Sequence, residues 1–403
     1  MQAKTLAFLA MILLSAASAS AVTETLAVTE TTINTFSGTN GLFPTSGLIF
    51  DASGNAYGTT ENGGDNFYGS IYQLTPIRGG GYSQSVLYSF TNGADGAYPS
   101  GPLAMDGSGN LYGTATGAGS TACNNGCGTV FKITPSKSGS FQVIYSFTGG
   151  TDGSNPAFGG LVFDKSGNLF GTTELSGSTG AGTVFELSPG RGSWTETTLH
   201  GFQGGNDAGY PLMGLTIDPA GNLYGAAVRG QNGVGAVYWL KKTSSGYEES
   251  VLYSFQGGND GAYPEYGALI IKGKTIYGTT AGGGASNQGV VYSLALSNGK
   301  IVETPLYSFT GGNDGGQPFA GVVADSANYL YGATAYFGQY GDGVVFVLSQ
   351  KNGSWHESVI HAFVGSDGKY PLGTPVINGN ALYGTTQVGG SSNGGVVWQV
   401  TAK

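Results

Sequence analysis

The chain has 403 residues, including 75 glycines, and 12% of its residues are aromatic. Glycine is far above its usual share of about 7%, yet the aromatic side chains can bury a large apolar area, so we do not expect a disordered chain. Only 10% of the residues are charged and the net charge is −9. With no Lys/Arg cluster, the basic surfaces that bind nucleic acids or anionic membranes are excluded.

The first 21 residues have the pattern of a secretory signal peptide. Lys4 precedes an apolar run over residues 6–14, and small residues occupy 19–21. We expect cleavage after Ala21 and a mature chain of residues 22–403 that forms a single domain. The apolar run is too short for a membrane anchor, and the C-terminal VVWQVTAK has no hydrophobic tail. We therefore expect a secreted or extracellular protein without membrane insertion, with the periplasm as an alternative location.

A short phrase that ends in Phe recurs along the whole mature chain. It reads INTF, LYSF, IYSF, LHGF, LYSF, LYSF and IHAF, and its last residues are Phe36, Phe90, Phe147, Phe202, Phe255, Phe309 and Phe363. Successive phrases are 54, 57, 55, 53, 54 and 54 residues apart. So regular a period indicates a repeat architecture.

Each repeat contains four short runs typical of β-strands. The runs resemble GLVFD, GNLYGTT, GTVFEL and SVLYSF in that order, and they are rich in β-branched and aromatic residues. Turn residues separate them: Asp-x-x-Gly-Asn links the first run to the second in four units, and Asn378-Gly379 does so in the last. Four antiparallel strands per unit, repeated around an axis, are typical of a β-propeller.

The number of strands predicts how the ring closes. Six complete units follow Phe36, and residues 374–400 then supply only three strands. The missing fourth strand is TTINTF at residues 31–36. We therefore predict an all-β, seven-bladed β-propeller with four antiparallel strands per blade, the last blade being completed by the N-terminal strand, which removes an exposed sheet edge at the seam.

Two glycines recur at fixed places in every unit. The first follows the aromatic residue of the second run, as in Tyr57-Gly58, and we interpret it as a point where another chain segment comes close. The second begins the third run, as at Gly69. The recurring aromatic residue is expected to supply bulk between neighbouring blades.

The repeat resembles a known family. The pattern Y-G-T-T, a Gly-rich loop, G-T-V-F-x-L and then L-Y-S-F-x-G-G-x-D-G is similar to the GloVer (Gloeobacter/Verrucomicrobia) tandem-repeat proteins, and the resemblance covers nearly all of the mature chain. It implies a secreted bacterial propeller, in a family that often carries C-terminal sorting anchors. It implies no established activity and supplies no catalytic residues.

One face of the ring is expected to carry the variable loops. The linkers between units and the loops after the second run should lie on this face. Each linker carries an Asp or Asn a few positions before its proline, and these residues are Asn40, Asp95, Asp152, Asp207, Asp260, Asp314 and Asp367. Asp before Gly is typical of turns, where its side chain accepts a main-chain N–H. We favour this interpretation over Ca²⁺ ligation, because one carboxylate per linker does not make a cage.

The departures from the repeat are the candidates for ligand binding. They lie in the loops after the second run and are Glu61, Phe67, Tyr68, Glu174, Arg229, Tyr336, Phe337, Tyr340 and Asp342; Asp65 shares the first of these loops. Exposed rings beside carboxylates suit a sugar, because planar rings pack on its C–H face and polar groups take its hydroxyls. Ordinary loop variation without any ligand is the alternative interpretation. A third interpretation is that Glu61 and Glu174 form the acid/base pair of a glycosidase.

The remaining reactive residues favour structure over chemistry. His200 and His361 replace the tyrosine of the LYSF phrase and are assigned to packing or surface, and His356 is placed in a loop on the opposite face. No catalytic triad, metal site or cofactor is predicted. Cys123 and Cys127 are expected to form a disulfide across their loop.

These observations leave three functions open. We favour a non-catalytic, monomeric binding module whose partner is an extracellular glycan or a protein, with no nucleic-acid partner. The first alternative is a glycosidase or lyase that acts on polysaccharide through carboxylates of the loop-rich face. The second is a structural extracellular repeat protein. The few ionisable groups favour binding or structure over catalysis.

Overall fold

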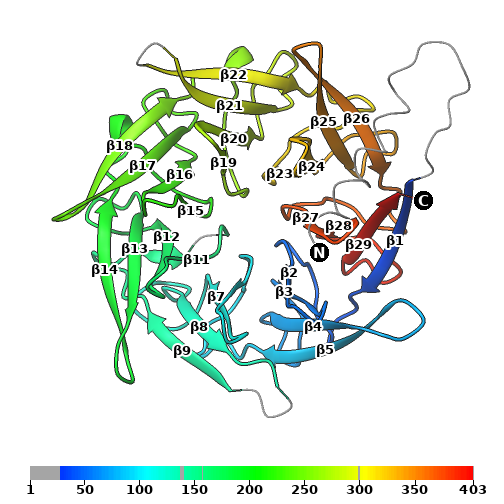
Figure 1. Ribbon diagram of the computed structural model, residues 1–403. Helices are drawn as coiled ribbons and strands as arrows, with labels where there is room; N and C mark the ends of the chain where they lie inside the picture. The colour runs from blue at the N-terminus through cyan, green and yellow to red at the C-terminus, as the bar shows by residue number, and fades with distance from the viewer. Residues whose placement is uncertain (1–27, 137–139, 157, 298–299, 403) are drawn as a thin grey trace, which may run out of the picture.

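The computed structural model describes residues 28–136, 140–156, 158–297 and 300–402, and it is a seven-bladed β-propeller (Figure 1). Seven antiparallel sheets surround a central axis, as the repeat predicts. The helical segments of the described ranges are two single 3₁₀ turns, η1 (Gly205–Asp207) and η2 (Gly258–Asp260). Within those ranges, no helix has the length and apolar character that crossing a membrane requires. The expected signal peptide, residues 1–21, lies outside the described residues.

The blades are numbered in chain order, each from its innermost strand outward. Blade 1 contains β2 (Ile49–Phe50), β3 (Ala56–Thr60), β4 (Ser70–Pro76) and β5 (Tyr82–Ser89). Blade 2 contains β6 (Ala104–Met105), β7 (Leu111–Ala115), β8 (Thr129–Ile133) and β9 (Phe141–Ser146). Blade 3 contains β11 (Val162–Phe163), β12 (Leu169–Leu175), β13 (Thr183–Pro189) and β14 (Trp194–Gly201), and β10 (Ser154–Pro156) adds a short strand beside β12.

The second half of the ring repeats this order. Blade 4 contains β15 (Thr216–Ile217), β16 (Leu223–Ala227), β17 (Ala236–Thr243) and β18 (Gly246–Ser254). Blade 5 contains β19 (Ile270–Lys272), β20 (Thr275–Thr280), β21 (Val290–Ser297) and β22 (Lys300–Ser308). Blade 6 contains β23 (Val323–Ala324), β24 (Leu330–Thr334), β25 (Val344–Lys351) and β26 (Ser354–Ala362). Blade 7 contains β27 (Val376–Asn378), β28 (Ala381–Thr386), β29 (Val396–Ala402) and, outermost, β1 (Val28–Thr35).

The N-terminal strand closes the ring, as predicted. β1 pairs antiparallel with β29 from Val28↔Ala402 to Thr35↔Val396, and Figure 1 shows the two strands side by side at the seam. The main-chain N–H of Phe36 then donates to the carbonyl of Gly395 at 3.0 Å. The strand begins three residues before the predicted TTINTF segment. Its pairing satisfies the main-chain hydrogen-bonding groups that the edge strand of blade 7 would otherwise expose.

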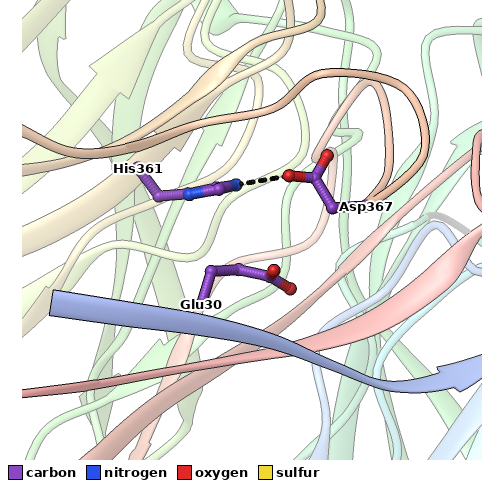
Figure 2. Close-up of side chains that lie close together, drawn as sticks. All are labelled: Glu30, His361 and Asp367. Atoms are coloured by element: carbon purple, nitrogen blue, oxygen red, sulfur yellow. Dashed lines mark hydrogen bonds and ion pairs between the residues drawn. The ribbon is translucent and has the colours of Figure 1, made fainter.

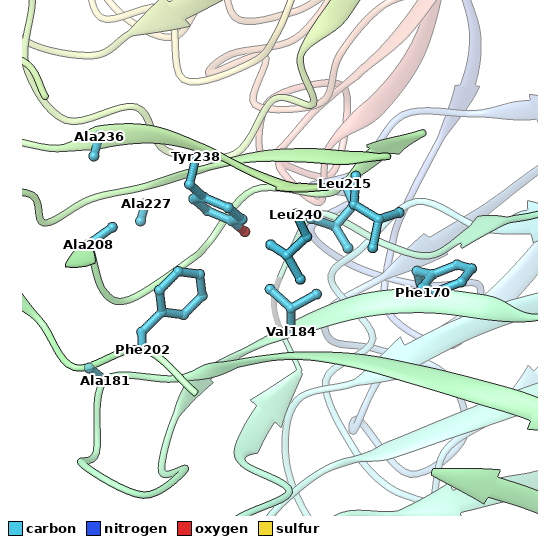
Figure 3. Close-up of a cluster of buried hydrophobic side chains, with 11 residues drawn as sticks. Phe170, Ala181, Val184, Phe202, Ala208, Leu215, Ala227, Ala236, Tyr238 and Leu240 are labelled. Atoms are coloured by element: carbon cyan, nitrogen blue, oxygen red, sulfur yellow. The ribbon is translucent and has the colours of Figure 1, made fainter. Parts of the chain in front are cut away.

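Apolar side chains of neighbouring sheets form the core between blades. In the cluster of Figure 3, Phe170 and Val184 of blade 3 pack with Tyr238 and Leu240 of blade 4, and all four side chains are buried. The other clusters join neighbouring blades in the same way; Tyr57 of blade 1, for example, packs with Phe131 of blade 2. The recurring aromatic residue therefore supplies the bulk between blades that the sequence predicted.

Both recurring glycines lie where a side chain does not fit. A Cβ on the glycine of each Tyr-Gly or Phe-Gly pair would overlap an aromatic ring of the next strand; at Gly171 it would lie 2.6 Å from Phe185 Cζ. The glycine that begins the third strand has a positive φ and faces the proline of the linker to the next blade, as Gly343 faces Pro371. The predicted close approaches are confirmed, the second one being between blades.

Three details differ from the sequence prediction. The first strands are only two or three residues long, because the residues before them pack against the same segment of the adjacent blade: a Cβ on Gly47 would lie 2.7 Å from the carbonyl oxygen of Thr374. The short strand β10 was not foreseen. His356 lies inside β26 and not in a loop, because the two-residue turn Asn352-Gly353, with both φ positive, lets the strand resume at once.

Candidate functional site

The linkers and the loops after the second strands meet on one face, which we call the loop face. Each linker bonds to two blades through the residue that precedes its proline. Tyr263, for example, donates its N–H to Val234 of blade 4 at 2.7 Å and accepts the N–H of Ala281 of blade 5 at 2.9 Å. This double bonding holds seven non-glycine residues in the left-handed region, with φ between 55° and 58°; they are Phe43, Tyr98, Asn155, Tyr210, Tyr263, Gln317 and Tyr370. Such strain persists only where the surroundings fix it, so the rim of the loop face is rigid.

The linker aspartates stabilise the turns that follow the fourth strands, as predicted. Asp95 Oδ2 accepts the N–H of Thr91 at 2.8 Å, and Asp314 Oδ2 accepts that of Thr310 at 2.8 Å. The same main-chain bond is made by Asp152, Asp207, Asp260 and Asp367, and Asn40 makes it to Ser37. Each of these side chains therefore accepts a main-chain hydrogen bond within its own turn.

A cavity of about 500 Å³ lies on the axis of the ring and opens at the loop face. Its walls are mainly the apolar first strands and the glycine-rich segments before them, including Leu48, Ile270 and Val323. Its polar lining includes Glu61, Tyr266 and Gln387 near the loop face. The volume is in the range of small-molecule sites.

Three glutamates surround Tyr266 at this mouth. Glu61 and Glu174 occupy the same position of the repeat in blades 1 and 3, and Glu265 follows the linker proline of blade 5. Glu61 directly follows β3, but Glu174 lies inside β12 and not in the predicted loop, because β12 continues to Leu175 where it pairs with β10. Burial raises the pKa of all three carboxyl groups, that of Glu265 to about 7. A hydrogen bond from Asn155 opposes this shift at Glu174. Burial and the charges of Glu265, Glu174 and Glu61, in that order, raise the pKa of Tyr266 to about 12, so the three carboxylates act on one small region.

Five aromatic rings form a continuous arc beside these carboxylates. Their centroids are separated by 4.9 Å from Phe158 to Tyr266, 5.6 Å to Phe319, 6.0 Å to Tyr336 and 5.0 Å to Tyr370. The rings come from blade 3, blade 5, blade 6 and the linker to blade 7. We call them the aromatic arc. Tyr336 is its most open ring, at 36% exposed, and it lines a hollow of about 530 Å³ together with Gln317, Phe337 and Gly341.

The structure brings some of the predicted binding residues together and leaves others apart. Glu61, Glu174 and Tyr336 lie at the mouth, and Phe337 lines the hollow beside Tyr336. Asp342 forms an ion pair with Lys369 at 3.2 Å, which gives it a structural partner.

The other predicted residues belong to outer loops. Tyr68 packs edge-on against Tyr98 of the next linker, and Arg229 donates to the carbonyl of Gly233 in its own loop. Phe67 and Tyr340 are 58% and 54% exposed. These two rings are available to a partner, but they lie outside the aromatic arc.

Five residues of this region were not among the predicted binding residues; they are Phe158, Glu265, Tyr266, Phe319 and Tyr370. Four of them follow a linker proline by one or two positions, where other units carry small or aliphatic residues such as Thr45, Ser100 and Leu212. Comparison of these positions across the seven units reveals the exceptions in the sequence itself.

A second hollow, of about 1240 Å³, lies beside the disulfide loop. Cys123 and Cys127 are bonded, as predicted. Cys123 contributes to the lining of the hollow with the other loop residues 116–126, whereas Cys127 is buried and does not. Its lining residues include no carboxylate, Lys, Arg or His. It therefore offers less for a polar ligand than the axial mouth does.

The seven blades define the class of the protein as a β-propeller built from tandem repeats, and comparison with known families identifies the repeat. The family model described as the Gloeobacter/Verrucomicrobia repeat matches residues 20–174 and 157–398. The chain belongs to this family, as the repeat pattern indicated. A comparison with curated protein sequences finds no match.

Three solved structures align with this chain at low sequence identity. A putative 6-phosphogluconolactonase from Bacteroides uniformis aligns at 14% identity with a TM-score of 0.53, over 87% of this chain and 94% of that one. A puromycin-hydrolysing peptidase from Mycobacterium tuberculosis aligns at 9% identity with a TM-score of 0.52, over 86% of this chain and 49% of that one. A putative oxidoreductase (glucose dehydrogenase) from Thermus thermophilus aligns at 15% identity with a TM-score of 0.42, over 93% of this chain and 100% of that one. At these identities the Bacteroides uniformis and Mycobacterium tuberculosis structures support the fold alone.

Proposed function

We propose that the protein is a non-catalytic extracellular module that binds a neutral glycan at the mouth of its axial cavity. The observation that carries this proposal is the aromatic arc, which places five rings in sequence beside Glu61, Glu174 and Glu265. Rings in a row can pack against the C–H faces of successive sugar units. The carboxyl groups beside them can accept or donate hydrogen bonds to hydroxyls.

The charge of the mouth favours an uncharged ligand. The residues that line the axial cavity include Glu61 and no Lys or Arg. A phosphorylated sugar, such as the substrate class named for the Bacteroides uniformis protein, would place an anion next to carboxylates without a cation to pair with. Neutral polysaccharide carries no such penalty.

The location of the protein is part of the proposal. The predicted signal peptide supports export, and the Cys123–Cys127 disulfide is consistent with an oxidising compartment. A glycan outside the cytoplasm is therefore the ligand we propose to test first, on a panel of neutral polysaccharides.

The test compares two exposed tyrosines of the same loop. Tyr336 belongs to the arc, whereas Tyr340 lies four residues on and outside it. Once a glycan array has identified a ligand, we expect Tyr336→Ala to weaken binding about tenfold, equivalent to about 1.4 kcal/mol, and Tyr340→Ala to leave it unchanged. Isothermal titration calorimetry measures both.

The outcomes separate the alternatives. A loss confined to Tyr340→Ala would move the site to the outer loops. The absence of binding on a broad glycan array would overturn the proposal. A structural role or a protein partner would then remain, and a pull-down with the same variants would test for the protein partner.

A polysaccharide-active enzyme is the second candidate, and one observation favours it. Burial holds the pKa of Glu265 at about 7, so at neutral pH part of this carboxyl group is protonated and able to act as a general acid. Glu61 or Glu174 would then supply the second carboxylate that glycoside hydrolysis needs. A reducing-sugar assay on the array ligand decides: release that is abolished by Glu265→Gln supports an enzyme, and no release leaves the binding module.

A further inference from the structure

Two histidines replace a repeated tyrosine where neighbouring blades meet. In four units this tyrosine donates to the linker aspartate, as Tyr253 does to Asp260 at 2.9 Å; the other pairs are Tyr88–Asp95, Tyr145–Asp152 and Tyr307–Asp314. In blades 3 and 6, His200 Nε2 lies 3.0 Å from Asp207 Oδ1 and His361 Nε2 lies 3.0 Å from Asp367 Oδ2. Imidazole preserves this contact through Nε2, and when Nε2 carries no proton the same nitrogen can instead bind a metal ion beside the carboxylate.

A glutamate from the next blade completes each cluster. Glu249 of β18 approaches His200 and Asp207, and Glu30 of β1 approaches His361 and Asp367. In each cluster one ligand atom from each residue lies within 4.8 Å of the other two. Figure 2 shows the Glu30 side chain rising from β1 toward the His361–Asp367 pair. Two carboxylates and one imidazole thus converge from two different blades.

These clusters contain more negative than positive charge. The Oε1 atom of Glu249 is buried and has no hydrogen-bond partner among the described residues. Glu30 is placed in the same way beside Asp367, so each cluster brings two carboxylates and one imidazole together. A cation bound between the two carboxylates would offset the repulsion between their charges.

At the seam between blades 7 and 1, the three positions that correspond to these clusters carry uncharged amide side chains. Here Asn34 stands where the other units have Tyr or His, Asn40 replaces the aspartate, and Gln84 replaces the glutamate. Gln84 Oε1 accepts from Asn34 Nδ2 at 3.1 Å and from Asn40 Nδ2 at 2.9 Å. Three amides satisfy one another without any ion, so a blade interface does not itself require the charged set.

The spacing of the His and Asp donors fits one metal ion, and the Glu donor lies within 4.8 Å of both. Two ligand atoms that each lie about 2.1 Å from a common Zn²⁺ are roughly 3.0–3.4 Å apart at right-angled to tetrahedral bond angles. The His–Asp separations of 3.0 Å fall in this range. The glutamate supplies a third ligand with a small side-chain movement, and water can take the open position.

We propose that His200, Asp207 and Glu249, and likewise Glu30, His361 and Asp367, bind a divalent transition-metal ion between blades, Zn²⁺ being the ion to test first. The first site links blades 3 and 4. The second links blade 6 to β1, the strand that closes the ring, so metal there ties the N-terminal strand to a second blade. Both histidines were predicted to serve packing or surface, and no metal site was predicted, so this proposal departs from that prediction.

The test uses the substitution that the repeat itself makes. In calorimetric titration of the tag-free protein with ZnCl₂ at neutral pH, we expect two equivalents bound, one in His200→Tyr or His361→Tyr, and none in the double variant. Tyrosine occupies this position in four other units, so the fold should survive. His356→Tyr is the matched control, because His356 is exposed and belongs to neither cluster; it should retain two equivalents.

A second readout keeps the proposal falsifiable if a tyrosine variant does not fold. Glu30→Gln and Glu249→Gln reproduce the amide found at Gln84, and each should lose one equivalent of Zn²⁺ and its share of the zinc-induced rise in melting temperature. Unchanged zinc binding in the folded double variant, or no saturable binding of Zn²⁺, Co²⁺, Ni²⁺ or Mn²⁺ by the parent protein, would overturn the proposal.

Discussion

Glu303 of blade 5 lies against Asp260 of blade 4, and its buried Oε1 has no hydrogen-bond partner among the described residues. Burial and the charge of Asp260 raise the pKa of Glu303 to about 8. Glu357 has the same relation to Asp314 of blade 5, and burial with that charge raises its pKa to about 7. The neutral acid is therefore the form that suits these interfaces, because a single proton relieves the repulsion between the two carboxylates.

The first prediction is a loss of stability as pH rises. A carboxyl group whose pKa is higher in the folded than in the unfolded state contributes stability that is fully present below its unfolded pKa, near 4.5, and is lost as pH rises through 7 to 8. We expect the melting temperature, followed by circular dichroism, to fall by several degrees between mildly acidic and mildly alkaline pH.

The control for this prediction is the amide that blade 1 already carries at this position, Gln84. The double variant Glu303→Gln and Glu357→Gln should show a flatter profile and melt higher than the parent at alkaline pH. Asp51, Asp106 and Asp218 lie in the turns between the first and second strands, where hydrogen bonds lower their pKa against the opposing effect of burial. The stability that these three carboxylates contribute is therefore lost only at acidic pH and does not affect the alkaline part of the profile. A melting temperature that rises steadily toward alkaline pH would contradict the assignment.

The second prediction concerns ring closure. Phe36 follows the closing strand, is fully buried and meets Tyr72 of blade 1 edge-on at 4.9 Å. Phe36→Ala should lower the free energy of unfolding by about 3–5 kcal/mol, because it opens a cavity between blades 7 and 1. Removing residues 28–36 should lower the melting temperature further, since β29 then loses its outer partner. Denaturant titration measures the first change and thermal melting the second.

A peptide of residues 28–36 provides the control for the truncated chain. Added in excess, it should raise the melting temperature by restoring the β1–β29 pairing. A truncated chain that melts like the parent would show that this strand does not hold the ring closed.

Most of the fold was predictable because it is repeated. A constraint that recurs seven times, such as the glycine under each aromatic ring or the glycine facing each linker proline, is visible as periodic sequence. Closure was also predictable, because it follows from counting strands: residues 374–400 supply three, and the fourth must come from the other end of the chain.

The candidate sites were harder to predict because they depend on contacts between units. Glu249 approaches Asp207 only because blade 4 packs its outer strand against the linker of blade 3. A sequence signal existed: a Glu or Gln stands four residues before the Tyr, His or Asn of the fourth strand in six units, at Glu30, Gln84, Glu196, Glu249, Glu303 and Glu357. Which linker aspartate this Glu or Gln contacts depends on the angle between neighbouring blades, and the sequence of a single unit does not specify that angle.

The third prediction tests the repeated glycine. Gly171→Ala places a Cβ 2.6 Å from Phe185 Cζ in a fully buried site, so overpacking should cost about 1–3 kcal/mol of unfolding free energy. Gly107→Ala is the matched control, because a Cβ there meets no atom within 4 Å; its effect should stay within about 0.5 kcal/mol. Phe185→Leu combined with Gly171→Ala should cost less than the sum of the two single changes, as a double-mutant cycle measures.

The fourth prediction concerns the disulfide loop. Cys123 and Cys127 close a short loop, so replacing both with serine should cost about 2 kcal/mol on the chain-entropy model. Because the loop projects from blade 2 and does not enter the axial cavity, the variant should bind the array ligand as the parent does. Denaturant titration with and without reductant measures the stability term, and the parent in reductant should match the serine variant. If glycan binding fell together with stability, the ligand site would instead include the hollow beside the disulfide, because the loop lines that hollow and is separate from the aromatic arc.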